Sequence, residues 1–363
     1  MFSFIKIFPS SRPKGEPVGR VRPGRRRWLA YGGWRKLIRP TRAPTLERGS
    51  QRDRFPNSRM KKIGNGSPML GVIIVNYNAG DLLADCVQAV LASPIDLEVF
   101  VSDNGSRDGS LTRLRRHQGG DPRLTILKHG SNLGFARGNN LALAHTRAPY
   151  LLILNPDCIV GPDSLGQLLD FMDATPDAGM AGCMIRNPDG SEQRSARRRI
   201  PTPRIGLTRF LYLGRFFPQL TRNERLDLID DPVPEGPVPV EAVSGALMLV
   251  RRSALEEVGP LDEGYFLHCE DLDWFMRFRR AGWKLYLVPN VAVVHHQGSC
   301  STGRPIAVEW HKHKGMVRFF RKFQLRDYPL PFGVLVVIGI WAHFGLFLAV
   351  YGLRRLAGQG RKR

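Results

Sequence analysis

From residue 71 onward, apolar residues follow two alternating patterns. Short, wholly apolar and β-branched runs are typical of strands buried on both faces of a sheet, whereas an apolar residue at every third or fourth position is typical of an amphipathic helix. Strands are expected at residues 71–75, 97–102, 124–127, 150–154 and 181–185, and helices after Asp81 and at residues 111–117, 136–145 and 163–172. The alternation predicts βαβ units with right-handed crossovers, and therefore an α/β fold with a mostly parallel sheet.

The pattern becomes weaker after residue 194. Residues 194–204 hold five arginines, which could form a solvated face or a surface that contacts phosphate. Residues 205–239 have little periodicity and several prolines, so we expect a variable insertion. Regular elements then return as a strand at 240–250, a short helix capped by Ser253, a helix that buries Trp274, Phe275 and Phe278, and strands at 283–288 and 291–294.

Polar residues follow three of the predicted strands at their carboxyl ends. These segments are Asn76-Tyr77-Asn78, Asp103-Asn104-Gly105-Ser106 and Asn155-Pro156-Asp157. Each segment alone is ordinary turn chemistry. Because ligands of open α/β sheets bind outside the carboxyl ends of the strands, three such segments at one edge indicate a binding site.

An acidic stretch, His268 to Trp274, places three carboxylates within four residues immediately before an apolar helix. Glu270, Asp271 and Asp273 repel one another unless their charge is used. A helix N-terminus stabilises negative charge through the macrodipole, which is one explanation. An active site that needs a base and a cation partner is the other.

The C-terminal region contains two further helical patterns. Residues 306–324 set apolar residues among lysines and arginines, as in a helix that lies on a membrane surface. Residues 329–353 contain no Asp, Glu, Lys or Arg, and about 20 apolar residues suffice to cross a bilayer, so we predict a membrane-embedded helix. A buried core helix remains the alternative. Basic residues flank both ends, so the charges assign no orientation, and an in-plane or re-entrant helix fits them as well as a span.

Charge is concentrated at the N-terminus. Of the net charge of +22, residues 1–68 supply a surplus of 15, with 18 Lys and Arg against Glu16, Glu47 and Asp53. This Arg-, Pro- and Gly-rich segment is expected to be a disordered tail, and Met60, just before the first strand, is a natural alternative start. The basic charge does not extend over a predicted folded face, which argues against nucleic acid as a partner. The five cysteines show no CxxC spacing and are expected to be reduced thiols.

The strand-end residues could divide a transfer reaction among them. Asp157 is placed to hold Mg²⁺ or Mn²⁺, hard cations that take oxygen ligands together with phosphate, and His295 could complete the metal shell. Asp103 is placed to accept hydrogen bonds from a nucleotide base or ribose. Asp271 or Glu270 could accept the proton of an acceptor hydroxyl. A structural role for the lone histidine stays open, as does a contribution from His296.

An ordered set of motifs carries a family resemblance over residues 71–301. The motifs are Val72-Ile-Ile-Val-Asn-Tyr-Asn78, Val101-Ser-Asp-Asn-Gly-Ser-Arg-Asp-Gly-Ser110, Asn132-Leu-Gly-Phe-Ala-Arg-Gly-Asn-Asn140, Leu154-Asn-Pro-Asp157, Gly245-Ala-Leu-Met248 and Glu270-Asp-Leu-Asp-Trp274. Together they resemble an inverting family 2 glycosyltransferase with the GT-A fold, close to the bacterial rhamnosyltransferase branch.

The resemblance implies a nucleotide-diphosphate sugar donor, Mg²⁺ or Mn²⁺, and direct displacement at the anomeric carbon. It implies that Asp271 is the catalytic base, with Glu270 beside it, that Asp157 and His295 hold the metal, and that the donor nucleotide is bound by Asn76, Tyr77, Asn78, Asp103, Asn132, Gly134, Asn139 and Asn155. Asn155 stands at the position of the family's Asp-x-Asp metal motif where an Asp is often found. Only one carboxylate of the motif is therefore present, which favours His295 as an additional metal ligand.

The expected organisation is a basic tail at 1–68, a GT-A domain at 69–305, an amphipathic helix at 306–328, a membrane-embedded helix at 329–353 and a basic tail at 354–363. The expected activity moves a sugar, with rhamnose favoured by the branch, to a glycan or lipid-linked acceptor at the cytoplasmic face of the bacterial inner membrane. The alternative is a membrane-associated protein that binds nucleotide sugars without turnover. A nucleotidyltransferase is disfavoured because no Gly-rich phosphate loop follows the first strand.

Overall fold

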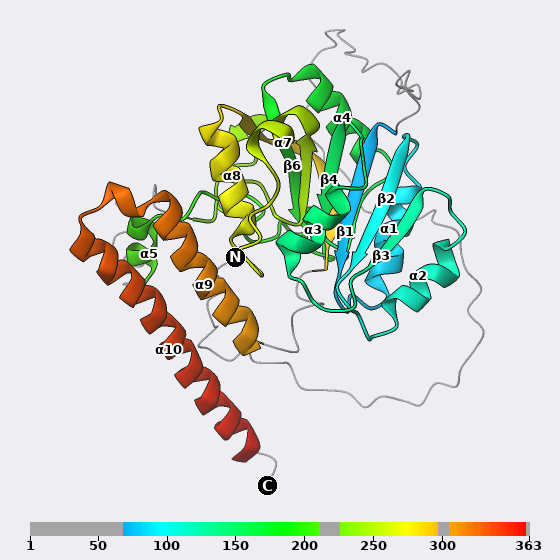
Figure 1. Cartoon of the computed structure of the whole chain (residues 1–363). Helices are drawn as coiled ribbons and strands as arrows, with labels where there is room; N and C mark the ends of the chain where they lie inside the picture. The colour runs from blue at the N-terminus through cyan, green and yellow to red at the C-terminus, as the bar shows by residue number, and fades with distance from the viewer. Residues whose placement is uncertain (1–67, 211–225, 297–304, 361–363) are drawn as a thin grey trace, which may run out of the picture. The chain divides into compact units, whose positions relative to one another are not determined.

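The computed structural model describes residues 68–210, 226–296 and 305–360. Within these residues, nine strands form one sheet in the order β3-β2-β1-β4-β8-β6-β9-β5, and β7 pairs with β9 (Figure 1). The predicted basic tail, the alternative start at Met60, and residues 211–225 of the predicted insertion lie outside the described residues.

The elements follow the chain in an alternating order. The strands are β1 (Leu70–Asn76), β2 (Leu97–Asp103), β3 (Leu124–Lys128), β4 (Tyr150–Leu154), β5 (Cys158–Ile159), β6 (Ala178–Arg186), β7 (Val238–Val240), β8 (Leu247–Arg251) and β9 (Lys284–His295). The helices are α1 (Leu82–Leu91), α2 (Ser110–Gln118), α3 (Phe135–Leu143), α4 (Ser164–Ala174), α5 (Pro203–Phe210), α7 (Arg252–Val258), α8 (Glu270–Arg280), α9 (Pro305–Phe323) and α10 (Leu330–Gly360), with a 3-10 turn at Leu325–Asp327 between the last two.

Four parallel pairings confirm the predicted βαβ architecture. They join β1 to β2, β1 to β4, β2 to β3 and β6 to β9. β8 runs antiparallel between β4 and β6, and the short β5 and β7 run antiparallel to β9. The result is a Rossmann-like sheet in which β1, β2 and β4 end at the same edge.

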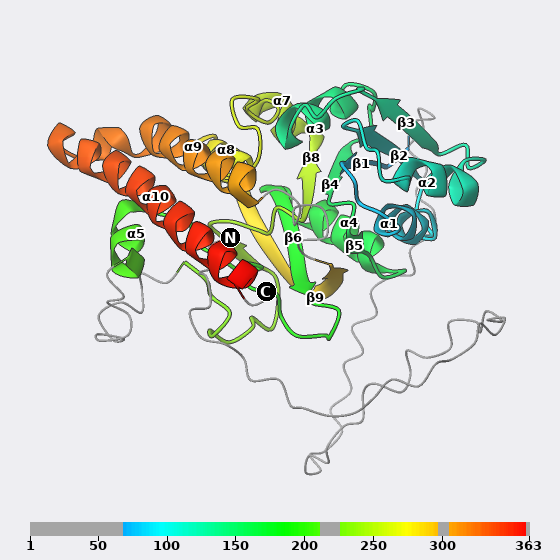
Figure 2. The same cartoon turned by 90° about the horizontal axis from the view of Figure 1, so that it is seen from below.

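Alternation along the central strands supplies both faces of the sheet. On β1, Val72 and Ile74 join a core with the apolar sides of α1 and α4, whereas Ile73 joins a second core with residues of α3, α7, α8 and α9. Every β1 residue is buried, as expected for a strand covered on both faces. Figure 2 shows α1 and α4 near each other and α3 and α7 on the opposite side of the sheet.

Several boundaries differ from the sequence prediction. The strand expected at 240–250 is divided into β7 and β8, because residues 241–246 form the loop that carries Gly245. Ser253 lies inside α7 and does not cap it, since the helix begins at Arg252 after an extended Arg251. The two strands expected at 283–294 form one strand, β9, whose pairing with β6 shifts register between Cys183 and Met184.

The helix α9 does not leave its apolar face free for a membrane. Phe319 and Phe323 are buried in the core shared with α8. The basic residues Arg318 and Lys322 form ion pairs with Asp262, 2.9 and 2.7 Å long. The hydrophobic and charged positions that suggested a membrane-surface helix are therefore used in packing against the rest of the domain.

The helix α10 is different. The helical segment Leu330–Leu356 is long and apolar enough to cross a membrane, and little of it is buried. Its apolar residues remain accessible over most of its length, so the alternative of a buried core helix is wrong.

Candidate active site

Asn76 and Asp103 join the ends of β1 and β2. They are opposite each other in the parallel ladder, and both are buried. The amide nitrogen of Asn76 lies 2.7 Å from Asp103 Oδ1 and within 3.0 Å of the hydroxyls of Ser106 and Ser110. The Ser106 backbone N–H donates to the second Asp103 oxygen at 3.2 Å. Asp103 is therefore held in one orientation by neutral donors at the edge where ligands of such sheets bind.

The loops that follow these strands are also fastened together. Asn78 takes a left-handed conformation with φ of +56°, and its backbone N–H donates to Ser106 Oγ at 3.0 Å. Its side-chain oxygen accepts from the Arg107 backbone N–H at 2.8 Å. Tyr77 between them is half-buried. This arrangement holds the loop that contains Tyr77 against the loop that follows Asp103.

A second set of contacts connects this rim to the loop before α8. Asn104 donates to Asn132 Oδ1 at 3.3 Å and to the Gly134 carbonyl at 3.0 Å. Gly134 has a φ of +86°, and a Cβ there would lie 2.5 Å from the Phe266 carbonyl oxygen, so only glycine fits. The Phe135 N–H donates to that same carbonyl at 2.9 Å. The motif that contains Asn132 and Gly134 thus brings the loop before α8, which leads into the acidic stretch, close to the carboxyl end of β2.

Asn139, another predicted donor contact, lies inside α3. It is fully buried, and its amide nitrogen donates to the Phe135 carbonyl of the same helix at 2.9 Å. Its side-chain oxygen is buried without a partner among the described residues. The amide nitrogen of Asn139 is therefore engaged within α3. Only its side-chain oxygen remains without a hydrogen-bond donor among the described residues.

Asp157 and His295 meet at the ends of β4 and β9. Asp157 Oδ1 lies 3.0 Å from His295 Nε2, and both side chains are buried. His295 Nδ1 lies 2.7 Å from Gln193 Oε1. Gln193 Nε2 donates to the His295 and Asn187 oxygens, which fixes Oε1 as the acceptor and gives His295 a proton on Nδ1.

This tautomer makes the pair suited to a cation. With Nδ1 engaged by Gln193, Nε2 is the ring nitrogen that faces the Asp157 carboxylate, where a proton or a metal ion could lie between the two atoms. The carboxylate of Asp157 and the Nε2 atom of His295 would hold a divalent cation, and a hard cation accepts such oxygen and nitrogen ligands together with phosphate. A histidine whose other nitrogen donates to a fixed oxygen is a common metal ligand. Asn155 lies beside the pair, with Nδ2 3.5 Å from His295 Nε2.

Cys158 also lies near these two atoms, but it does not suit the same ion. The Sγ, carboxylate and imidazole atoms of Cys158, Asp157 and His295 are all within 4.8 Å of one another. Burial raises the pKa of the Cys158 thiol well above its ordinary value, and the nearby Asp157 carboxylate raises it further. A thiol that stays protonated is not a ligand for a hard cation.

Asp271 is the second residue of α8, and its side chain forms an ion pair. Its Oδ2 contacts Arg198, and both side chains are buried. Its Oδ1 accepts from the Leu272 backbone N–H at 2.8 Å. A Cβ on Gly245 would lie 2.7 Å from Oδ2, so the missing side chain makes room for the carboxylate. Neither interpretation of the arginine run holds for Arg198, which is neither solvated nor exposed to phosphate.

The loop that carries Gly245 also links Asp271 to the carboxyl end of β4, which Asn155 and Asp157 follow. The carbonyl of Ala246 accepts from the Asn155 backbone N–H at 2.9 Å. Gly245 is therefore adjacent in sequence to a residue bonded to Asn155 and adjacent in space to Asp271. Asp103 and Asp157 follow β2 and β4 at the same edge of the sheet, and Asp271 is connected to that edge through Gly245 and Ala246.

Glu270 differs from its neighbour in charge state. Burial, followed by the negative charge of Asp271, raises the pKa of Glu270 to about 8. Its Oε2 is buried without a hydrogen-bond partner among the described residues. Glu270 therefore holds its proton more tightly than an ordinary glutamic acid does, and Asp271, which contacts Arg198, is the candidate base.

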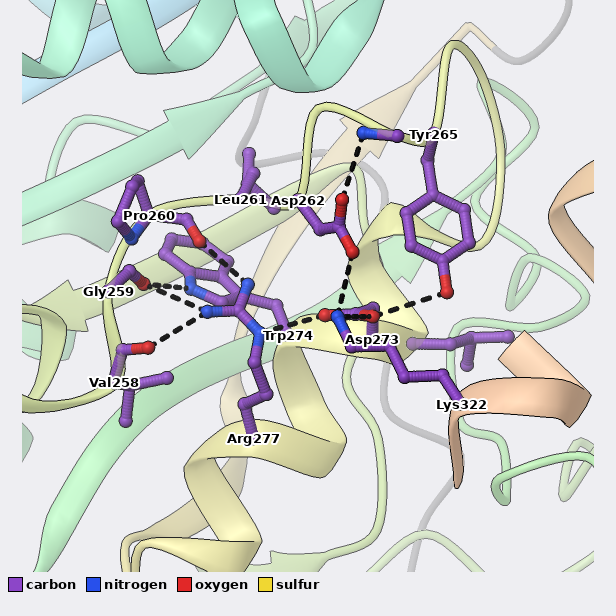
Figure 3. A network of polar contacts seen from close by, with 12 residues as sticks. Val258, Gly259, Pro260, Leu261, Asp262, Tyr265, Asp273, Trp274, Arg277 and Lys322 are labelled. Atoms are coloured by element: carbon purple, nitrogen blue, oxygen red, sulfur yellow. Dashed lines mark hydrogen bonds and ion pairs between the residues drawn. The ribbon is translucent and has the colours of Figure 1, made fainter. Parts of the chain in front are cut away.

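The third acid, Asp273, has a structural environment. Figure 3 shows it between Arg277, Lys322 and Tyr265, with distances of 2.7, 2.7 and 3.2 Å. Arg277 also donates to the Val258 and Pro260 carbonyls at 2.9 and 2.7 Å. This network ties the loop before α8 to α9. For Asp273, unlike the other two acids, the hypothesis of a structural acidic first turn therefore explains the side chain.

The turn that presents these acids is strained. His268 and Cys269 both have φ of +71°, a region that non-glycine residues rarely occupy. A Cβ on Gly315 of α9 would lie 2.8 Å from the His268 carbonyl oxygen. Such strain persists only where the surroundings enforce it, which is typical of functional sites.

Sequence reasoning did not identify two partners in this site. Gln193, which orients His295, follows an ordinary turn and has no local signature. Arg198 was visible only as one of five arginines, and its pairing with Asp271 joins residues 73 positions apart. A buried acid needs a cation, so the acidic stretch itself was the available signal for Arg198.

Comparisons with known proteins identify the chemistry of this arrangement. The family model for glycosyl transferase family 2 matches residues 71–259. The N-acetylglucosaminyl-diphospho-decaprenol L-rhamnosyltransferase of Mycobacterium tuberculosis is 34% identical over 263 residues, which are 68% of this chain and 81% of that protein. The rhamnosyltransferase WbbL of Escherichia coli K12 is 27% identical over 63% of this chain and 83% of its own.

A solved structure supports the fold. The mannosyltransferase PcManGT from Pyrobaculum calidifontis, in complex with GDP-Man and Mn²⁺, matches with a TM-score of 0.50 and 20% identity, covering 78% of this chain and 72% of that one. This likeness confirms the GT-A fold. The family and its relatives confirm an enzyme, so a binding protein without turnover is not retained. The chain belongs to glycosyl transferase family 2, as a rhamnosyltransferase-like hexosyltransferase that uses a nucleotide-sugar donor.

Proposed function

We propose that the chain transfers rhamnose from a nucleoside-diphosphate donor to a hydroxyl of a lipid-linked glycan, with Mg²⁺ or Mn²⁺ as cofactor. The sugar and the acceptor are supported by the printed names of the two rhamnosyltransferase relatives, one of which acts on a decaprenol-linked diphosphate. The geometric observation that carries the proposal is the single sheet edge shared by Asp103, Asp157 and Asp271.

The sheet edge at the carboxyl ends of β1 and β2, which we call the nucleotide edge, would hold the sugar-nucleotide donor. Asp103, oriented by Asn76 and Ser106, presents acceptor oxygens for a base or ribose. Tyr77 and Asn78 lie in the adjoining loop. Asn132 and Gly134 shape the loop next to it. Asn139 contributes by packing within α3.

Asp157 and His295 would hold the metal ion. A divalent cation supplies positive charge that stabilises the departing diphosphate. The Nδ1–H of His295, donated to Gln193, keeps Nε2 available as a ligand. The solved mannosyltransferase with the same fold contains Mn²⁺.

Asp271 would accept the proton of the acceptor hydroxyl. The hydroxyl oxygen forms a bond to the anomeric carbon as the bond from that carbon to the diphosphate oxygen breaks, and the nucleoside diphosphate leaves. Arg198 holds the Asp271 side chain in place through their buried ion pair. Glu270, protonated beside it, adds no second negative charge that would compete for that proton.

The place of action would be the cytoplasmic face of the bacterial inner membrane, where nucleotide sugars and a lipid-linked acceptor can meet. The apolar α10 supports attachment to that membrane.

A donor panel tests this proposal. The purified full chain is incubated with Mn²⁺, an N-acetylglucosaminyl-diphospho-prenol acceptor and rhamnose, glucose, galactose or mannose carried on nucleoside diphosphates. We expect transfer from the rhamnose donor at more than about ten times the rate of any other. Faster transfer of another sugar contradicts the assignment of rhamnose, and transfer at full rate in excess EDTA contradicts the metal.

A further inference from the structure

α10 presents one apolar stripe that nothing in the described part of the chain covers. At 100° per residue, its residues fall within an arc of about 160° and so on one side of the helix. They are Leu330, Val334, Leu335, Ile338, Leu346, Leu353 and Leu356, each at least half exposed. An exposed apolar surface of this length marks a membrane or protein contact.

The opposite side of α10 packs along α9. His343 Nδ1 lies 2.9 Å from His313 Nε2, and the Trp341 and Phe344 rings lie 5.1 and 5.7 Å from the ring of Trp310. At the other end, a Cβ on Gly333 would lie 2.4 Å from Leu325. Figures 1 and 2 both show the two helices side by side. The contacts extend from residue 333 to residue 344 of α10.

α9 is fixed to the catalytic part of the chain along the same length. Lys322 contacts both Asp262 and Asp273 at 2.7 Å, and Arg318 contacts Asp262. Lys314 and Arg321 are exposed on the same helix. A helix with these charges does not enter the hydrocarbon region, because a charged side chain there is costly.

These contacts leave too little of α10 to cross a bilayer. Beyond Phe344, nine residues remain before Arg354. At 1.5 Å per residue they extend about 14 Å, whereas the hydrocarbon core is about 30 Å thick. A spanning α10 would have to separate from α9 and leave His313 and His343 without each other.

We infer that α10 lies in the plane of the membrane, with its apolar stripe in the lipid and both of its ends on the side of the catalytic domain. The bilayer is the occupant because the basic residues Arg326, Arg354 and Arg355 flank the stripe, as expected for contact with anionic lipid headgroups. This arrangement rests on the proposed membrane attachment and places the sheet edge at a fixed height beside a lipid-linked acceptor.

Thiol labelling in bacterial spheroplasts tests the arrangement. Cys86, Cys158, Cys183 and Cys269 are buried and stay in place. In the full chain with Cys300→Ser, one exposed thiol is added by Arg363→Cys, at the end of the basic tail, or by Arg116→Cys, on the exposed side of α2. A membrane-impermeant maleimide is added before or after the membranes are opened. We expect the chain in the membrane fraction, both thiols protected in intact spheroplasts and both labelled once the membranes are open.

Two results overturn the inference. Labelling of Arg363→Cys but not Arg116→Cys in intact spheroplasts shows a span, and recovery of the chain in the soluble fraction shows that the stripe does not bind lipid. As a matched test, Ile338→Glu is expected to reduce the membrane-bound fraction at least tenfold, whereas Tyr351→Glu, five residues from Leu346 and therefore about 140° away from it around the helix, reduces it less. Equal losses contradict the stripe. None of these results depends on transfer, so failure of the donor panel is distinguishable from failure of the in-plane arrangement.

Discussion

The nucleotide edge and the turn before α8 satisfy their polar groups in opposite ways. At the edge, Asp103 is surrounded by neutral donors from Asn76 and Ser106, all within one strand or loop of each other. At the turn, Asp271 is neutralised by the distant Arg198, and Glu270 is left protonated with an oxygen that has no partner among the described residues. The first region is prepared to bind, and the second holds charge that can change during a reaction.

The difference has an energetic basis. Hydrogen bonds from neutral donors each contribute about 1 kcal/mol, so the loss of one donor leaves Asp103 with its other partners. A buried charge that loses its partner costs about 3–5 kcal/mol. Changes at the edge should therefore weaken binding gradually, whereas changes at the turn should abolish transfer or destabilise the fold.

Asp271→Asn should have the largest effect. It removes the proton acceptor without changing the shape of the side chain, so kcat should fall by about a thousandfold while the Kd of the nucleotide donor stays within a factor of about three. Steady-state kinetics and calorimetric titration of the donor measure the two quantities. Glu256→Gln, an exposed acid on α7, is the matched control and should change neither. Near-normal turnover in Asp271→Asn removes this residue from the base role.

Asp157→Ala should weaken the metal site next. The affinity for Mn²⁺ in the presence of donor should fall by more than about a hundredfold, since one ligand is lost. Gln193→Leu, which removes only the partner of His295 Nδ1, should reduce it by about ten- to a hundredfold. Electron paramagnetic resonance of free Mn²⁺ measures both. Unchanged affinity in Asp157→Ala would show that the ion lies elsewhere.

Arg198→Gln should separate the two roles of the ion pair. Loss of the guanidinium leaves Asp271 buried and unpaired, which costs about 3–5 kcal/mol of unfolding free energy. It also removes the positive charge beside the Asp271 carboxylate, so the acidic limb of the kcat/KM profile should move to higher pH. Arg198→Lys should restore part of both. A loss of stability with an unchanged pH profile would leave Arg198 with a structural role only.

Glu270→Gln should have the smallest effect, visible mainly in the pH dependence of stability. The pKa of Glu270 is raised from 4.5 to about 8, so between these values the folded state binds a proton that the unfolded state has lost. Stability from this group is complete below the unfolded pKa and falls as pH rises through the folded pKa. Thermal unfolding between about pH 5 and 8 should therefore show a flatter decline in the variant. An identical slope in both proteins contradicts the raised pKa.

Most of the edge could be predicted from sequence because its residues stand in continuous motifs at strand ends. Asn76, Asp103 and Asp157 follow apolar runs directly, and the topology of parallel strands brings them to one side. The turn could be predicted only in part. Three acids were visible, but Asp273 proved structural because Arg277, Lys322 and Tyr265 come to it from two helices and a loop.

The residues that sequence patterns could not supply are the long-range partners. Arg198 and Gln193 lie in a segment without strong periodicity, and their roles depend on contacts 73 and 102 residues away. The function of α9 was also misjudged, because a helix with an apolar and a basic face has the same pattern whether it meets lipid or the acids of its own domain. Asp262 and Asp273 decide between these cases, and only the fold shows that they face α9.

The stereochemistry of transfer tests the central claim most directly, namely that Asp271 acts as a base in a single displacement at this edge. A sugar of known anomeric configuration is transferred from its nucleoside diphosphate, and the product is analysed by proton NMR before it can equilibrate. One displacement predicts that the anomeric configuration is inverted. A product with retained configuration would contradict the account, because retention requires either a second displacement or attack from the side of the leaving group.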